Sequence, residues 1–368
     1  MALLMRDKDP IYVARPFLPH IDSLMEYVRK IYESRTLTNR GPLVSMLEEE
    51  LSDFLGVRHL ILTANGTLAL QVAYRALGLK QNVITTPFSF VATTSTLVWE
   101  GIRPVFADIH PRKLTLDPVN IAKNVTAGTT GIVPVHVFGN PCDVESIKEI
   151  AEDRRLRVVY DAAHAFGVKY KGKSILNHGD VSILSFHATK LFHTIEGGAI
   201  VTSDAETARL VRSMINFGIT GYDKISGLGI NAKMNEFEAA MGLCVLKNFP
   251  RILASYRKAW MTYHESLDGL VDFPELSMHT EWNYSYVPIL LRDEKQLLKV
   301  KKKLNANRIY PRRYFYPSLD TLQYLVDVSS HPVSRSVSQR ILCLPNYYGL
   351  NQVTIKMITK LIKETVEK

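Results

Sequence analysis

An aspartate and a lysine each follow a short apolar run in this chain, and together they could do chemistry. Asp161 comes directly after Val158–Tyr160, and Lys190 follows the apolar run 181–186. Open α/β sheets place working residues just beyond the carboxyl ends of their strands. A lysine enclosed there has a lowered pKa, so its amine can attack an aldehyde. A carboxylate beside a pyridine nitrogen keeps that nitrogen protonated, so the ring can accept electrons.

Each of these residues also has an ordinary interpretation. Asp161 fits equally well as a helix N-cap, and most lysines lie on the surface. A third segment, Thr63–Thr67, has a glycine between a predicted strand and a predicted helix. Amides at a helix N-terminus suit a phosphate, although a plain turn capped by Thr67 explains this segment by itself. The order of phosphate turn, acid and lysine, each at a strand end, favours a pyridoxal 5'-phosphate site.

The elements that must position these residues alternate between short apolar runs and helical spacing. Strands are predicted at His59–Thr63, Val83–Thr86, Pro104–Ala107, Ile132–Val137, Val158–Tyr160, Val181–Phe186 and Ala199–Thr202. Helices are predicted at Thr67–Leu77 and Val144–Asp153. Strands that alternate with helices are typical of an α/β layer built on a mostly parallel sheet.

Amphipathic helices are predicted before this layer and at the end of the chain. Their apolar positions are Ile21, Leu24, Met25, Val28, Ile31 and Tyr32, then Leu43, Met46, Leu47, Leu51 and Phe54, and finally Ile355, Ile358, Ile362 and Val366. After residue 245 the pattern changes to a helix at Ile252–Leu267, a strand at Tyr284–Leu291, a helix at Glu294–Leu304 and an aromatic-rich strand at Tyr310–Tyr316. We therefore expect a large α/β domain, 1–247, and a smaller α+β domain, 248–368.

The composition is that of an ordinary globular protein. Of the 368 residues, 46% are hydrophobic and 22% charged, and no apolar stretch is long enough to cross a bilayer. The first ten residues lack the features of a signal peptide. Three cysteines lie far apart, so neither a disulfide framework nor a zinc site is predicted. These features predict a cytoplasmic protein without membrane insertion.

The formal net charge of +9 is compatible with nucleic acid, a membrane surface or a small anionic substrate. The densest basic cluster, Lys299 with Lys301–Lys303, fits a solvated helix face. No nucleic-acid-binding signature accompanies it, so we expect no nucleic-acid partner. The charge permits an anionic substrate without identifying one.

Several short motifs, taken in order, resemble the DegT/DnrJ/EryC1/StrS family of pyridoxal-phosphate-dependent sugar aminotransferases. They are Leu37–Pro42, Asn65–Leu70, Thr86–Thr93, Asp161–Gly167, Ser185–Lys190 with Glu196–Gly198, Gly229–Met234 before Ala239 and Ala240, Arg313–Pro317, and Leu344 with Pro345. The resemblance runs almost end to end. It implies a fold type I transferase, like aspartate aminotransferase, in which the α/β layer is the large cofactor-binding domain.

The resemblance also implies three catalytic roles. Lys190 would bond to the cofactor aldehyde and then carry the proton between substrate and cofactor carbons. Asp161 would pair with the pyridinium nitrogen. His164, where the family has Gln or His, would lie near the cofactor's phenolic oxygen.

The other implied cofactor contacts surround the phosphate and the ring. Gly66, Thr67 and Ser185 would hold the phosphate, and Phe90 would stack on the pyridine ring. We expect the neighbouring Phe88 to pack in the core instead. Asn231 would reach the phosphate from a second subunit, which makes the active site a property of a homodimer, although a helix cap before Met234 is the alternative for this residue.

A nucleotide-sugar substrate needs cations for its diphosphate, and guanidinium groups suit phosphate geometry. Arg313, Arg312 and Lys233 are candidates for this role, with Tyr314 and Tyr316 as hydrogen-bonding groups. His187, three residues before the lysine, could face the sugar. Each of them also fits a surface or packing role.

Lys190 also bears on the reaction, because the dehydratases of the family have histidine there. Lysine favours transamination, and Ser185–Lys190 resembles the enzymes that aminate carbon 4 of dTDP-linked 4-keto-6-deoxy hexoses. We expect ping-pong transfer of the amino group of L-glutamate to dTDP-4-dehydro-6-deoxyglucose, giving dTDP-4-amino-4,6-dideoxyglucose for a surface polysaccharide such as O-antigen. The alternatives are a UDP-linked or 3-keto sugar as acceptor, or a regulator that binds these molecules without turnover.

Overall fold

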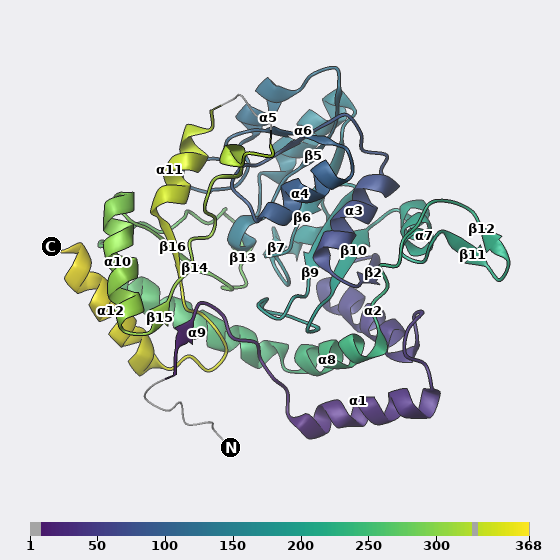
Figure 1. Cartoon of the computed structure of the whole chain (residues 1–368), viewed down its shortest axis with the longest axis horizontal. Helices are drawn as coiled ribbons and strands as arrows, with labels where there is room; N and C mark the ends of the chain where they lie inside the picture. Colours follow the sequence, from purple (N-terminus) through teal and green to yellow (C-terminus); the bar gives the residue numbers. More distant parts are fainter. Residues whose placement is uncertain (1–8, 326–329, 368) are drawn as a thin grey trace.

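A seven-stranded sheet forms the centre of the computed structural model, which describes residues 9–325 and 330–367 (Figure 1). In spatial order the strands are β2 (His59–Thr63), β10 (Gly198–Thr202), β9 (Val181–Ser185), β6 (Arg157–Asp161), β5 (Thr129–Val133), β3 (Asn82–Thr85) and β4 (Arg103–Phe106). All run in one direction except β10, which is antiparallel to β2 and β9. The predicted mostly parallel α/β layer is confirmed.

Helices connect and cover these strands. They are α2 (Pro42–Leu55), α3 (Gly66–Ala76), α4 (Val91–Trp99), α5 (Pro118–Asn124), α6 (Val144–Arg154), α7 (Ala205–Met214) and α8 (Glu236–Lys247). One predicted strand, Ile132–Val137, ends early. Pro134 lacks the amide that would continue the ladder, and the chain enters a short 3-10 turn, η1 (Val137–Gly139). In this turn Phe138 has a φ of 57°.

The C-terminal part contains two antiparallel strands flanked by helices. Its elements are α9 (Phe249–Leu267), β14 (Val287–Leu290), α10 (Glu294–Ala306), β15 (Ile309–Tyr310), η3 (Leu319–Thr321), α11 (Pro332–Arg340), β16 (Ile341–Leu344) and α12 (Gln352–Val366). The predicted apolar face of the last helix is confirmed, since Ile355, Ile358 and Ile362 are buried. β14 pairs with β16 over its whole length.

The predicted aromatic-rich strand Tyr310–Tyr316 was wrong. Only Ile309–Tyr310 is a strand, and it pairs with β1 (Ile11–Tyr12) near the N-terminus. Pro311 follows and cannot donate to a ladder. The next residues form an irregular segment in which Phe315 is buried and Tyr316 is half-exposed. The remaining short elements are β7 (Lys169–Tyr170), β8 (Lys173–Ser174), η2 (Ile175–Asn177), β11 (Ile219–Gly221), β12 (Lys224–Ile225) and β13 (Thr280–Glu281).

The start of α2 shows how distant segments are joined. Glu236, at the start of α8, is fully buried and accepts hydrogen bonds from the amides of Leu43 (2.8 Å) and Val44 (2.9 Å). These amides have no acceptor within their own helix, and the carboxylate satisfies them. Gly41 leaves the room this needs, because a Cβ there would lie 2.7 Å from the Glu236 carboxyl carbon.

Two apolar surfaces have no partner within the described chain. The first helix, α1 (Ile21–Ser34), buries Tyr27 and Ile31 but leaves Ile21, Met25 and Tyr32 exposed, so the predicted apolar face is only partly covered. The β11–β12 hairpin projects from the body of the molecule, as Figure 1 shows, and exposes its apolar side chains Tyr222 and Ile225. Exposed apolar groups of this extent are commonly contact surfaces.

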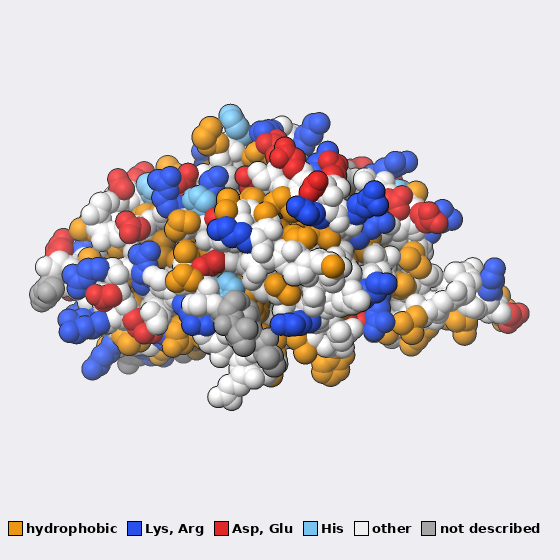
Figure 2. All heavy atoms as spheres, turned by 90° about the horizontal axis from the view of Figure 1, so that it is seen from above, with side chains coloured by type: hydrophobic (Ala, Val, Ile, Leu, Met, Phe, Trp, Pro, Cys, Tyr) orange, Lys and Arg blue, Asp and Glu red, His pale blue; other side chains and the backbone are white. Residues whose placement is uncertain are grey.

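Charged side chains are mixed on the face seen in Figure 2, where lysine and arginine alternate with aspartate and glutamate. This face carries no continuous basic surface of the kind that follows a nucleic-acid backbone. Within residues 9–325 and 330–367, no helix combines the length and the apolar character needed to cross a bilayer.

Candidate active site

A cavity of about 540 Å³ lies at the carboxyl ends of β2, β6 and β9, a size typical of small-molecule sites. Ten of the candidate site residues named from the sequence line it: Gly66, Thr67, Phe90, Asp161, His164, Ser185, His187, Lys190, Arg312 and Tyr314. Segments far apart in the chain thus meet where strand ends predict that they should.

Asp161 is the last residue of β6 and is 5% exposed. Its Oδ2 accepts a hydrogen bond from Thr93 Oγ1 (2.7 Å), and its Oδ1 accepts one from the amide of Ala163 (3.1 Å). Burial raises the pKa of the Asp161 carboxyl, while these two hydrogen bonds and the charge of Lys190 act in the opposite direction. Asp161 lines the cavity, where a carboxylate held in this way can pair with a cationic group.

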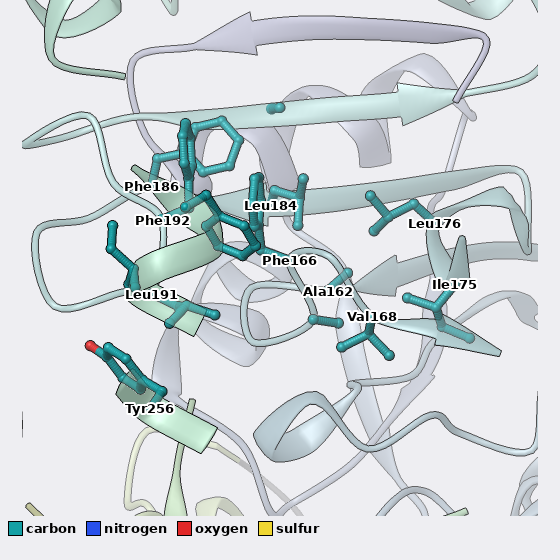
Figure 3. Close-up of a cluster of buried hydrophobic side chains, with 14 of the residues drawn as sticks. Ala162, Phe166, Val168, Ile175, Leu176, Leu184, Phe186, Leu191, Phe192 and Tyr256 are labelled. Carbon is teal, nitrogen blue, oxygen red and sulfur yellow. The ribbon is translucent and has the colours of Figure 1, made fainter. Parts of the chain in front are cut away.

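Lys190 follows β9 and is held by aromatic packing on both sides. Phe186, Leu191 and Phe192 are buried, and the Phe192 ring lies 4.9 Å from Phe186 and 4.4 Å from Phe166 (Figure 3). The loop between Phe186 and Leu191 therefore has little freedom at either end. Burial lowers the pKa of Lys190 to about 8, although the charge of Asp161 opposes this. Near neutral pH a useful fraction of the amine is uncharged and nucleophilic.

His164 lines the cavity as a neutral imidazole. Its Nδ1 accepts the amide N–H of Phe138 (3.2 Å), so in the neutral ring the proton is on Nε2. Burial, and then the charge of Lys190, hold the pKa of His164 well below its usual range. The ring stacks on Phe315 at 5.7 Å, which fixes its plane.

The phosphate turn is formed where α3 meets β9. Asn65 is the N-cap of α3, and its side chain accepts the amide of Leu68 (2.8 Å). Gly66 packs directly on the strand end, because a Cβ there would lie 2.9 Å from the Cβ of Ser185. The amides of Gly66 and Thr67, the first two of the helix, border the cavity beside Ser185.

The two phenylalanines are separated as expected. Phe88 is fully buried and packs on Phe138 and Phe315. Phe90, the residue before α4, lines the cavity and is 56% exposed, so its ring is available to a flat ligand.

Arg313 and Tyr316 lie outside the cavity, so their role in substrate binding stays a prediction. The Arg313 guanidinium donates to Glu294 Oε1 (2.6 Å) and to the carbonyls of Ser338 and Gln339, and it covers the Tyr316 ring at 3.4 Å. These contacts hold the two side chains against α10 and α11. Arg312 lines the cavity instead.

Asn231 also lies outside the cavity of its own chain. It is exposed, and its Oδ1 accepts a hydrogen bond from Lys233 Nζ (2.8 Å). The adjacent carbonyl of Ala232 accepts the amide of Ala64, so this segment is attached to the phosphate turn. Lys233, a candidate for the diphosphate, lies outside the cavity as well.

Two groups of the site were missed in the sequence, one lining the cavity and one behind Asp161. Tyr286 lies at the cavity wall with its hydroxyl 3.4 Å from Lys190 Nζ, and Thr93 bonds Asp161. The Thr86–Thr93 motif contained Thr93 without suggesting a function for it. Tyr286 stands in the apolar segment 284–291, where the pattern predicts no more than a strand.

The residues of the cavity fit pyridoxal 5'-phosphate. An amine of lowered pKa suits the aldehyde, a buried carboxylate suits the ring nitrogen, and helix N-terminal amides beside a serine suit the phosphate. The close contact of Gly66 with Ser185 leaves this phosphate cradle free of side-chain bulk. The fold and the cavity together define a fold type I pyridoxal-phosphate enzyme.

Comparison with known proteins gives the family. A model of the DegT/DnrJ/EryC1/StrS aminotransferase family matches residues 20–363. A dTDP-4-amino-4,6-dideoxy-D-glucose transaminase from Shigella dysenteriae is 40% identical over 96% of this chain and 99% of its own. The Escherichia coli protein of the same name is 39% identical over 97% of this chain and 99% of its own. A crystal structure of DesI in the presence of its TDP-sugar product superposes with a TM-score of 0.93 at 35% identity, covering 98% of this chain and 94% of DesI.

The chain belongs to the DegT/DnrJ/EryC1/StrS aminotransferase family. Its cofactor is pyridoxal 5'-phosphate, as the sequence predicted. The predicted family, fold and enzyme class are therefore confirmed.

Proposed function

We propose that this enzyme transfers the amino group of L-glutamate to carbon 4 of dTDP-4-dehydro-6-deoxyglucose, giving dTDP-4-amino-4,6-dideoxyglucose. The observation that carries the chemistry is the Lys190 amine, with its lowered pKa, in one cavity with the buried Asp161 carboxylate. The substrate is supported by the names of the two relatives at 40% and 39% identity, which span almost the whole chain.

In this proposal Lys190, Asp161 and His164 have different roles in proton transfer. When bound, pyridoxal 5'-phosphate supplies a sink for the electron pair left on carbon after a proton is removed. Lys190 takes that proton as the free amine and returns it as the ammonium. Asp161 holds a negative charge opposite the ring nitrogen, and His164 donates its Nε2–H to the phenolic oxygen.

The phosphate and the ring have separate contacts in this proposal. The amides of Gly66 and Thr67 and the Ser185 hydroxyl bind the phosphate, and Phe90 stacks on the ring. Among the substrate contacts, Arg312 supplies positive charge to the diphosphate, Tyr314 supplies a hydrogen bond, and His187 faces the sugar from the cavity mouth.

We further propose a homodimer in which each subunit completes the other's site. Asn231 of one subunit reaches the phosphate bound by its partner, which explains why it is exposed and outside its own cavity. The uncovered apolar side chains of α1 and of the β11–β12 hairpin supply the contact surface.

The division of the chain at Lys247 stays a proposal, with a large domain 1–247 and a small one 248–368. It coincides with the boundary between α8 and α9. β1 pairs with β15, however, so the start of the chain lies on the small domain. A cytoplasmic location and a product used in a surface polysaccharide such as O-antigen belong to the same proposal.

The test is a panel of dTDP-, UDP- and GDP-linked sugars with 4-keto or 3-keto groups, each incubated with glutamate and pyridoxal 5'-phosphate. Mass spectrometry reports amination, and NMR gives the position and configuration of the new amine. We expect rapid conversion of dTDP-4-dehydro-6-deoxyglucose to the 4-amino product. Faster conversion of a UDP-linked or 3-keto sugar would refute the proposed substrate.

A further inference from the structure

Tyr286 contacts the reacting amine directly. Its hydroxyl lies 3.4 Å from Lys190 Nζ, and its ring lies 4.4 Å from the His164 ring. Tyr286 immediately precedes β14, whose first residue, Val287, pairs with Leu344 of β16. The tyrosine is therefore held by the small domain while the lysine is held by the sheet.

The hydroxyl of Tyr286 is a neutral group in this environment. Burial raises the pKa of the Tyr286 phenol well above its ordinary value, and repulsion from neighbouring acidic groups, Asp161 among them, acts in the same direction. The other titratable groups that line the cavity around the amine are Asp161, His164, His187, Glu196, Arg312 and Tyr314. Of these, Asp161 acts on the Lys190 charge through space.

We propose that Tyr286 is a positioning residue whose hydroxyl holds the Lys190 amine in the cavity whenever that amine is not bonded to the cofactor. This inference rests on the proposed function, because it concerns the same lysine. It adds a residue to which neither the family motifs nor the sequence pattern gave a role.

A phenol suits this task because it both donates and accepts hydrogen bonds. It donates to the free amine and accepts from the ammonium, so the lysine keeps one partner as it takes up and releases a proton. A carboxylate in the same place would accept only and would favour the charged form. The 3.4 Å separation is long for a hydrogen bond, so the amine remains free to leave for the aldehyde.

The test measures the protonation of Lys190 in the protein without cofactor. Trace acetic anhydride labels amines in proportion to their uncharged fraction, and mass spectrometry of the peptide containing Lys190 gives an inflection between pH 6 and pH 11. In Tyr286→Phe the ammonium loses a charge-assisted hydrogen bond, which is stronger than the neutral one. We expect the inflection to fall by about one pH unit, the equivalent of a tenfold change in the protonation equilibrium.

Tyr256→Phe is the matched control. Tyr256 is buried near Leu191 in the core cluster of Figure 3 and does not line the cavity. The inflection of Lys190 labelling in Tyr256→Phe should therefore equal that of the wild type. Far-ultraviolet circular dichroism and thermal unfolding establish that both variants are folded. A Tyr286→Phe inflection within about 0.2 pH units of wild type would overturn the inference, because no proton equilibrium would have changed.

A second measurement uses the cofactor-loaded enzyme. We expect Tyr286→Phe to lower kcat about tenfold with little change in KM for glutamate, since positioning acts on the proton transfer. An unchanged kcat would contradict the inference even in a folded variant. Absorbance on adding pyridoxal 5'-phosphate to the wild type tests the proposed function separately: a colourless wild type would refute that function whatever the labelling shows.

Discussion

The two sides of the cavity are built differently. On the cofactor side, Asp161 and Ser185 are the last residues of neighbouring strands, and buried rings anchor Lys190. On the substrate side, the irregular segment 311–317 supplies Arg312 and Tyr314 from outside the central sheet. Strand ends hold atoms to the tolerance that proton transfer needs, whereas loops can change to suit different sugars. In the proposed enzyme the residues that contact the cofactor lie mainly at strand ends, whereas Arg312 and Tyr314 contact the substrate from an irregular segment.

The largest effect is expected on the cofactor side. Lys190→Ala removes both the nucleophile and the proton carrier, and we expect transaminase activity to fall on the order of 10⁴-fold. Steady-state rates with glutamate and the keto-sugar measure it. The matched control is Lys171→Ala, which removes an exposed lysine paired with Glu145 and should leave the rate unchanged. If the transaminase rate of Lys190→Ala lay within tenfold of wild type, Lys190 could not be the nucleophile and proton carrier.

The same variant tests whether each active site combines Lys190 of one subunit with Asn231 of the other. Lys190→Ala mixed with Asn231→Ala should form hybrid dimers in which one site has Lys190 and the partner's intact Asn231. We therefore expect activity above that of either variant alone. If mixing restores nothing although the subunits exchange, Asn231 acts within its own chain or not at all.

Arg312 lines the cavity and the adjacent Arg313 does not, so substitutions of the two should have different effects. Arg312→Ala should raise KM for the nucleotide sugar about 10- to 100-fold, the loss expected for a charged hydrogen bond. Arg313→Ala should leave that KM alone and instead lower the free energy of unfolding by about 1–3 kcal/mol, because Glu294 and two carbonyls lose their donor. Saturation kinetics measure the effect on KM, and urea unfolding measures the effect on stability. If both variants raised KM equally, the position of Arg313 outside the cavity would be contradicted.

A smaller effect concerns stability and pH. The folded-state pKa of Lys190 is about 8, below its ordinary value of 10.5, so folding disfavours the ammonium. Between these values the unfolded chain binds more protons, and this group makes the folded state more stable as pH rises. Without cofactor, Lys190→Met should therefore be more stable than wild type by about 1–2 kcal/mol at pH 7, and the margin should shrink toward pH 10.5. Urea unfolding at several pH values measures this difference in the free energy of unfolding. A difference that grows with pH would contradict the lowered pKa of Lys190.

The difference between the two sides also decides what could be predicted from the sequence. Asp161 and Lys190 were found because a polar residue after an apolar run marks a strand end. β6, which ends at Asp161, and β9, which precedes Lys190, lie within one residue of their predicted bounds. The sequence does not show that Arg312 rather than Arg313 lines the cavity, because adjacent residues of an irregular segment face unrelated directions and no periodicity shows which one enters a cavity. Tyr286 was missed since its apolar neighbours predict core packing. α1 buries Tyr27 and Ile31 and leaves Ile21, Met25 and Tyr32 exposed, and in the proposed homodimer the partner subunit covers these exposed side chains.

The contact between Gly66 and Ser185 limits how this enzyme can be re-engineered. A methyl group at position 66 would have to push the start of α3 away from β9, and that displacement would pass along the same short loop to the reactive amine. A side chain added at position 66 to change the anion that the turn binds would thus also displace the Lys190 amine. Variation that spares catalysis has to enter from the side chains of Thr67 and Ser185.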